Sequence, residues 1–213
     1  MEEVCDVFDG LVDDFPGLVE KFDAATVSDL TYPRYANGVS SDDPDYLETP
    51  AYKTYMYKFS DTNAAAGNTT RFVKKKLMII GGTHGDEYFA PVNLAVFFSH
   101  MLRSPSKDLF AILSLFDIYV IPCTNGYGVI HKTRFNANGI DLNRNYPTSD
   151  WTQRGDPGDP EYSGSAPGSE FEVQLVMGVF NEVKPDLFID HHSYGTHVAT
   201  NFYTTTSSEA LLD

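Results

Sequence analysis

The 213-residue sequence is short of cysteine, of basic residues and of long apolar runs, and each shortage argues against a class of protein. Its two cysteines, Cys5 and Cys123, are too few for the disulfide framework of a small secreted scaffold, so we expect free thiols. Lys and Arg number 15 against 30 Asp and Glu, a net charge of −15. That charge argues against nucleic acid or an anionic membrane surface as a partner.

No apolar run approaches the roughly 18 residues that a membrane span needs. The first ten residues carry four acidic side chains and no basic one, unlike the start of a secretory signal. We therefore expect a soluble protein without a signal peptide or a transmembrane segment in this chain. Its location in the cell is not indicated.

The composition is otherwise that of a folded protein, with 42% hydrophobic and 14% aromatic residues. The acidic charge is uneven, because residues 1–70 hold 14 acidic and 4 basic side chains. We expect residues 1–70 to form an acidic N-terminal helix, a loop and an aromatic strand that pack on a main domain of residues 71–213.

Within the acidic segment, apolar residues at spacings of three and four across residues 6–22 predict an amphipathic helix interrupted near Pro16. Residues 28–50 are rich in Pro, Gly, Ser and Asp, which predicts an irregular loop. Residues 51–59 alternate, and this places three aromatic side chains on one face of a strand: Tyr55, Tyr57 and Phe59.

Beyond residue 74, short apolar runs alternate with longer helical patterns. We expect strands at 77–80, 116–122, 186–190 and 198–205, and helices at 85–102 and 169–183. This alternation predicts an α/β domain with a mixed, largely parallel sheet flanked by helices. Functional side chains are then expected just beyond the carboxyl ends of the strands.

Two polar segments follow such strands. His84 and Glu87 stand three residues apart at the start of an expected helix, where one helical turn would aim both at the same ion. His and carboxylate groups are natural zinc ligands, and a catalytic zinc needs three protein ligands plus an open position. His191 and His192 end another strand and offer a third ligand. Each pair alone also fits an ordinary polar surface. We expect His100 to have a structural role in its helix and His197 to pack at the start of a strand.

A third segment, GIDLNRNYP at residues 139–147, strengthens the metal-site interpretation. Four elements stand in order between Lys74 and Tyr194: GGTHGDE, IPCTNGYG, RFNANGIDLNRNYP and FIDHHSY. With these the sequence resembles the zinc carboxypeptidases of the carboxypeptidase A/T type and their peptidoglycan-cleaving bacterial and phage relatives. The resemblance implies a zinc-carboxypeptidase-like, phosphorylase/hydrolase-like fold whose C-terminal part is missing, with residues 71–213 as the N-terminal portion of the catalytic domain.

The resemblance also implies which residues act at the metal. One zinc ion would be held by His84, Glu87 and His192, while His191 falls where the family needs no ligand. Asp141 matches a carboxylate that accepts a hydrogen bond from the first zinc histidine. Fixing the orientation of a ligating imidazole in this way is worth about 10–100-fold in metal affinity or activity.

For the substrate, the resemblance implies that Asn143 and Arg144 bind the terminal carboxylate, a group that a guanidinium meets with two hydrogen bonds. Tyr194, of the family's His-Ser-Tyr tripeptide, is likewise expected to contact substrate. Arg134 is expected to stabilise the oxyanion that forms during hydrolysis. An alternative alignment places His131 in that role, and we prefer Arg134 because it is a permanent cation.

Two features depart from the family's pattern. Asn125-Gly126-Tyr127-Gly128 stands where the family has Asn-Pro-Asp-Gly, which is expected to loosen the local turn. The family's general base is a Glu far downstream of the third ligand, and no such residue is present in this chain. Glu209 is too close to His192 to be that base. We therefore expect the chain to be a fragment with weak or no activity by itself.

The expected function is a zinc metallocarboxypeptidase in which metal-activated water hydrolyses a C-terminal peptide bond. Its partner would be a peptide or a peptidoglycan peptide with a free C-terminal carboxylate. Two alternatives stay open at this point. One is a non-catalytic module of the same fold that binds carboxylates or peptides. The other is an aspartoacylase-type zinc amidohydrolase, which shares the GGTHG opening but prefers Asn where this chain has Ser193.

Overall fold

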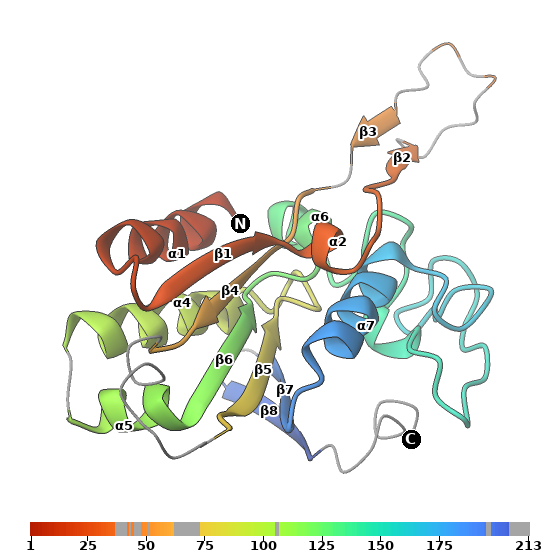
Figure 1. Ribbon diagram of the computed structural model, residues 1–213. Helices are drawn as coiled ribbons and strands as arrows, with labels where there is room; N and C mark the ends of the chain where they lie inside the picture. The colour runs from red at the N-terminus through yellow and green to blue at the C-terminus, as the bar shows by residue number, and fades with distance from the viewer. Residues whose placement is uncertain are drawn as a thin grey trace.

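A six-stranded sheet runs through the described part of the computed structural model, which comprises residues 1–36, 42, 44, 48–50, 52–61, 73–104, 107–194 and 197–204. The strand order is β1-β4-β6-β5-β7-β8 (Figure 1). The strands are β1 (Val19–Asp23), β4 (Tyr55–Phe59), β5 (Lys75–Gly81), β6 (Phe116–Ile121), β7 (Leu187–Tyr194) and β8 (His197–Thr204). The three central strands β6, β5 and β7 are parallel, and the flanking strands pair antiparallel.

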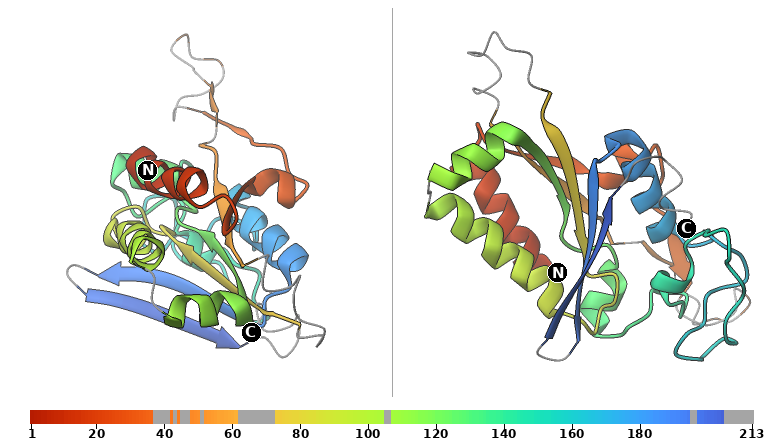
Figure 2. Two further views of the ribbon diagram at one scale, coloured as in Figure 1. Left: turned by 60° about the vertical axis from the view of Figure 1, so that its left-hand side comes forward. Right: turned by 90° about the horizontal axis from the view of Figure 1, so that it is seen from below.

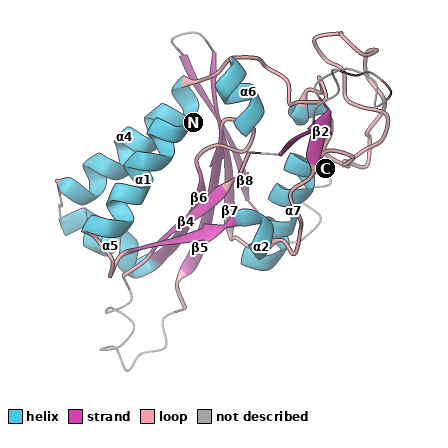
Figure 3. Ribbon diagram, turned by 90° about the horizontal axis from the view of Figure 1, so that it is seen from above, coloured by secondary structure: helices cyan, strands magenta, loops and turns pink. Residues whose placement is uncertain are grey.

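Helices cover both faces of this sheet (Figures 2 and 3). One face carries α1 (Glu2–Asp14), α4 (Phe89–Arg103) and α5 (Lys107–Leu115), and the other carries α2 (Ala24–Val27) and α7 (Phe171–Val183). The mixed sheet flanked by helices is therefore confirmed. None of the described helices combines the length and the apolar character needed to cross a membrane.

The central strands are buried on both sides, which explains their continuous apolar runs. Along β5, Met78 and Ile80 pack in the α7 cluster while Ile79 packs in the α1–α4 cluster. Along β4, Tyr57 and Phe59 share the α1–α4 cluster, as the alternation of aromatic residues predicts. The carboxyl ends of β5 and β7 consequently emerge side by side from a packed core.

The structure corrects three local expectations. Helix α1 ends at Asp14, and residues 19–23 form a strand, because pairing with β4 supplies backbone partners after Pro16 has broken the helix. The expected irregular loop contains a short antiparallel pair, β2 (Arg34–Ala36) with β3 (Glu48–Pro50). The helix expected from residue 85 begins at Phe89.

One further prediction of chain organisation lies outside the described residues, and some elements of the structure were not predicted. The expected boundary between residues 70 and 71 lies outside the described residues, so that division stays a prediction. The sequence patterns did not predict α5, nor the short helix α6 (Gly126–His131), nor the 3-10 turn η1 (Leu142–Arg144). The last two contribute to the site.

Candidate metal centre

His84 and Glu87 lie on the turn that connects β5 to α4. Gly82 has a φ of +67°, which only glycine adopts without strain, and it redirects the chain as β5 ends. The turn is closed by the backbone N–H of Glu87, which donates to the carbonyl of His84 at 3.3 Å. His84 and Glu87 thus stand on a turn and not on the expected first turn of a helix, but their side chains still converge. Nδ1 of His84 lies 2.7 Å from Oε1 of Glu87.

The second polar element of the sequence supports this turn. A side chain at Gly85 would overlap the backbone of Gly128 in α6, so the two segments touch through their glycines. Asn125 caps α6 by accepting from the N–H of Gly128 at 2.8 Å, and its Nδ2 donates to the carbonyl of Thr83 at 3.2 Å. A capped helix therefore occupies the loop after β6 and supports the residue next to His84.

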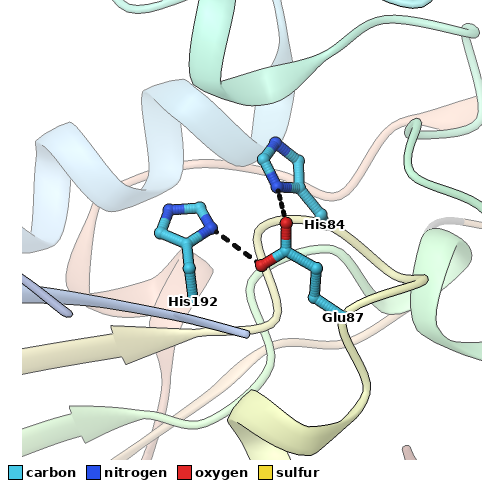
Figure 4. A group of neighbouring side chains, drawn as sticks. All are labelled: His84, Glu87 and His192. Atoms are coloured by element: carbon cyan, nitrogen blue, oxygen red, sulfur yellow. Dashed lines mark hydrogen bonds and ion pairs between the residues drawn. The ribbon is translucent and has the colours of Figure 1, made fainter. Parts of the chain in front are cut away.

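The third side chain of the group comes from β7. The register of the parallel pair places His191 beside Gly81, so the carboxyl ends of β5 and β7 meet. Side chains alternate along a strand, which puts His192 on the opposite face from His191. One ligand atom from each of His84, Glu87 and His192 lies within 4.8 Å of the others, and Figure 4 shows both rings directed at the carboxylate.

Each imidazole is also held from behind by a second carboxylate. Nε2 of His84 lies 3.0 Å from Oδ1 of Asp141, and Nε2 of His192 lies 2.8 Å from Oδ2 of Asp190. An acceptor at Nε2 keeps the ring proton there and leaves the Nδ1 lone pair for a metal. Both Nδ1 atoms face Glu87. Two imidazole nitrogens and one carboxylate form a donor set that fits zinc and leaves a fourth position open.

The electrostatics of the group favour positive charge between the rings. Burial lowers the pKa of both imidazoles, but the hydrogen bonds to the carboxylates on either side of each ring outweigh it. The pKa of His84 is raised, and that of His192 is raised to about 10. Burial raises the pKa of Glu87, but hydrogen bonds from the two rings and from the N–H of Ser193 hold it well below its usual range. A divalent cation would supply this positive charge with both rings neutral.

Arg134 reaches the same place from the segment after α6. Its Nε and Nη2 both donate to Oδ2 of Asp141, at 2.9 and 2.7 Å. Its Nη1 lies 3.4 Å from Nδ1 of His84 and 3.8 Å from Oε1 of Glu87. The guanidinium is thus fixed beside the candidate metal ligands. His131 is exposed at the end of α6, and its ring lies at a tilt against that of Tyr127, with the centroids 4.2 Å apart.

Asn143 and Arg144 stand on η1, which Asp141 caps by accepting from the N–H of Asn143 at 3.0 Å. The side chain of Asp141 therefore orients His84 and also caps the turn that carries Asn143 and Arg144, the residues expected to bind the substrate carboxylate. Arg144 donates from Nη2 to Oε1 of Glu161 at 3.3 Å. The indole of Trp151 donates to the carbonyl of Arg144 at 2.9 Å and holds the end of the turn.

Some expected residues are not placed by the structure. The side chain of Tyr194 and the whole of Glu209 lie outside the described residues, as does the side chain of His197. His100 is exposed on α4. The sequence interpretation missed Asp190, although a readable signal was present. Residues two apart on a strand share a face, so Asp190 had to lie on the side of His192.

Comparisons with known proteins agree with this geometry. A model of the zinc carboxypeptidase family matches residues 51–211. The murein peptide amidase A of Escherichia coli (strain K12) is 32% identical over 129 residues, which cover 54% of this chain and 48% of that protein. The corresponding protein of Vibrio campbellii is 42% identical over 113 residues, 52% of this chain and 39% of that protein. The chain thus spans about half or less of the length of these curated relatives.

Solved structures show the same fold. Carboxypeptidase A from Helicoverpa armigera has a TM-score of 0.65 at 20% identity, covering 92% of this chain and 46% of that one. At such identity the likeness concerns the fold alone. The family match, in contrast, extends over most of the chain and includes all three residues of the His-Glu-His group. The chain belongs to the zinc carboxypeptidase family.

Proposed function

We propose that this chain provides the metal and substrate-binding residues of a zinc metallocarboxypeptidase, which hydrolyses the peptide bond beside a free C-terminal carboxylate. The observation that carries the proposal is the convergence of His84, Glu87 and His192, with each imidazole fixed by its own carboxylate. Zinc held by these three side chains would polarise the scissile carbonyl and would make water nucleophilic at neutral pH.

The cationic side chains have distinct roles in this proposal. Arg134 is held by Asp141 beside the ligands, where a fixed positive charge stabilises the oxyanion that develops on the scissile carbonyl. Asn143 and Arg144 bind the terminal carboxylate of the substrate, a charge that a guanidinium meets as a fork. Tyr194 contributes to substrate contact from the end of β7.

The substrate class that we propose is a peptide or a murein peptide with a free C-terminal carboxylate. The similarity to murein peptide amidase A supports the murein branch of this class. The match to a carboxypeptidase family also supports peptide hydrolysis over the acylase alternative. Protein peptides and murein peptides both carry the terminal carboxylate that Arg144 would bind, so binding of that group alone does not separate them. A comparison of hydrolysis rates for the two substrates does.

A second candidate function is a binding module with weak or no turnover. Besides Glu87, the described residues place two carboxylates beside the ligand rings, Asp141 and Asp190. Each accepts a hydrogen bond from one ring. Their second oxygens accept from Arg134 and Thr83 respectively, so neither carboxylate is placed to take a proton from water. General acid–base assistance typically contributes about 10²–10⁴-fold, so hydrolysis by this chain alone is expected to be slow.

The proposal is tested first by metal content. We expect one zinc per chain in the wild type and in His100→Ala, which changes an exposed histidine of α4, but a clear loss in His84→Ala and His192→Ala. Stoichiometric zinc in both of the latter variants would refute the ligand set. Release of the terminal residue from a simple peptide and from a murein tetrapeptide then measures activity. Tight binding without release would favour the binding module.

A further inference from the structure

Asp190 lies behind His192, on the opposite side of the ring from Glu87. Its Oδ2 is 2.8 Å from Nε2 of His192, whereas Nδ1 of the same ring is 3.1 Å from Oε2 of Glu87. Asp190 and His192 share one face of β7, and Asp190 is only 6% exposed. The backbone therefore fixes this contact, and little solvent competes for it.

The second oxygen of Asp190 faces the other ligand segment. Thr83, the residue before His84, donates from its hydroxyl to Oδ1 of Asp190 at 3.3 Å. That hydroxyl also lies 3.4 Å from the hydroxyl of Thr124 after β6. Asp190 thus touches the turn that carries His84 as well as the strand that carries His192.

The two carboxylates behind the rings differ in their charge environment. Asp141 receives two N–H groups from Arg134, so its negative charge is shared with a guanidinium. In the described part of the chain no Lys or Arg forms an ion pair with Asp190, and its ion-pair partner there is His192. The negative charge of Asp190 therefore acts mainly on the imidazole.

We infer that Asp190 is a positioning residue for the metal centre. A neutral imidazole carries one N–H, and a carboxylate at Nε2 keeps it there, so the Nδ1 lone pair points at the metal and donates more strongly. The inference rests on the proposed ligand role of His192. Removing such a partner typically weakens metal binding by about 10–100-fold.

The experiment measures zinc affinity by competition with a chromophoric chelator. Asp190→Asn keeps the size of the side chain and removes the charge, and we expect a zinc dissociation constant raised by about 10–100-fold. Asp186→Asn is the matched control, because Asp186 stands just before β7 and pairs with exposed Lys75. We expect wild-type affinity for that variant. A cobalt-loaded sample should show an altered visible spectrum only for Asp190→Asn.

His192→Ala separates the possible failures. If it loses zinc while Asp190→Asn binds as tightly as the wild type, the inference on Asp190 is wrong and the proposed ligand set stands. If His192→Ala keeps wild-type affinity, the ligand set itself is wrong. Should Asp190→Asn not fold, nitrogen-15 spectra of histidine in the zinc-loaded wild type decide. An Nε2–H of His192 whose proton resonance is shifted far downfield, as a hydrogen bond to a carboxylate shifts it, supports the inference, and an Nε2–H resonance like that of a solvent-exposed imidazole overturns it.

Discussion

Arg144 already faces a carboxylate of its own chain. Nη2 of Arg144 is 3.3 Å from Oε1 of Glu161, whose side chain is 59% exposed. An exposed ion pair of this kind contributes only about 0–1 kcal/mol, so the carboxylate of a ligand competes for the guanidinium at little cost. The Nε of Arg144 is buried and has no hydrogen-bond partner among the described residues.

Arg144→Ala is expected to weaken binding of a peptide with a free C-terminus by more than tenfold. The reason is that hydrogen bonds to a charged group contribute about 1.5–3 kcal/mol each. Binding of the amidated peptide should hardly change, and calorimetric titration of both ligands measures the difference. Arg103→Ala, which alters an exposed arginine of α4 paired with Asp14, serves as the control. Equal losses for acid and amide would contradict the clamp.

At the scale of elements, the β5–α4 turn and α6 support each other. The turn carries two candidate ligands, yet its own backbone bonds are few. Much of its support comes from Gly128 of α6, which packs against Gly85, and from Asn125, which bonds to the carbonyl before His84. The position of the first ligand therefore depends on a helix that follows a different strand.

Gly85→Ala tests this dependence. The added Cβ would overlap the backbone of Gly128, and crowding in a packed region typically costs about 1–3 kcal/mol. We expect a lower free energy of unfolding by denaturant together with weaker zinc binding. Gly17→Ala is the control, since a Cβ there meets nothing within 4 Å. Wild-type stability and affinity in Gly85→Ala would show that the turn does not need α6.

At the scale of the whole molecule, a buried acidic cluster joins α7, which covers one face of the sheet, to the segment around Asn136 that precedes η1. Glu172 at the start of α7 accepts from the hydroxyl of Tyr35 at 2.9 Å and from Nδ2 of Asn136 at 3.2 Å. The same amide donates to Glu170 at 2.7 Å. Burial, with the nearby Glu170, raises the pKa of Glu172.

This raised pKa predicts a pH dependence of stability. The folded state binds the proton of Glu172 more tightly than the unfolded state, in which the pKa of this carboxyl is near its ordinary value of 4.5. The contribution of this group to the free energy of unfolding is full below that value and falls as pH rises through the folded pKa. Glu172→Gln should flatten the profile in this window, and Glu182→Gln, exposed on the same helix, should not. Identical profiles for Glu172→Gln and the wild type would refute the assignment.

Much of the site could be predicted because its signals are local. His84 and Glu87 stand close in sequence after one buried strand, and His192 ends a second, so parallel strands had to bring them together. The Glu161 contact could not be predicted, because it joins Arg144 to a residue 17 positions away across irregular chain. No periodicity extends across such a segment.

The sequence by itself determined the alternation of strands and helices, the buried central strands and the family to which their polar ends belong. Only the tertiary structure decided that residues 19–23 form a strand, where the helical pattern is overruled by pairing with β4. It likewise decided the contact of Gly85 with α6. The physical reason is that periodicity and turn chemistry are properties of neighbouring residues, whereas strand pairing and close packing depend on which distant segments meet.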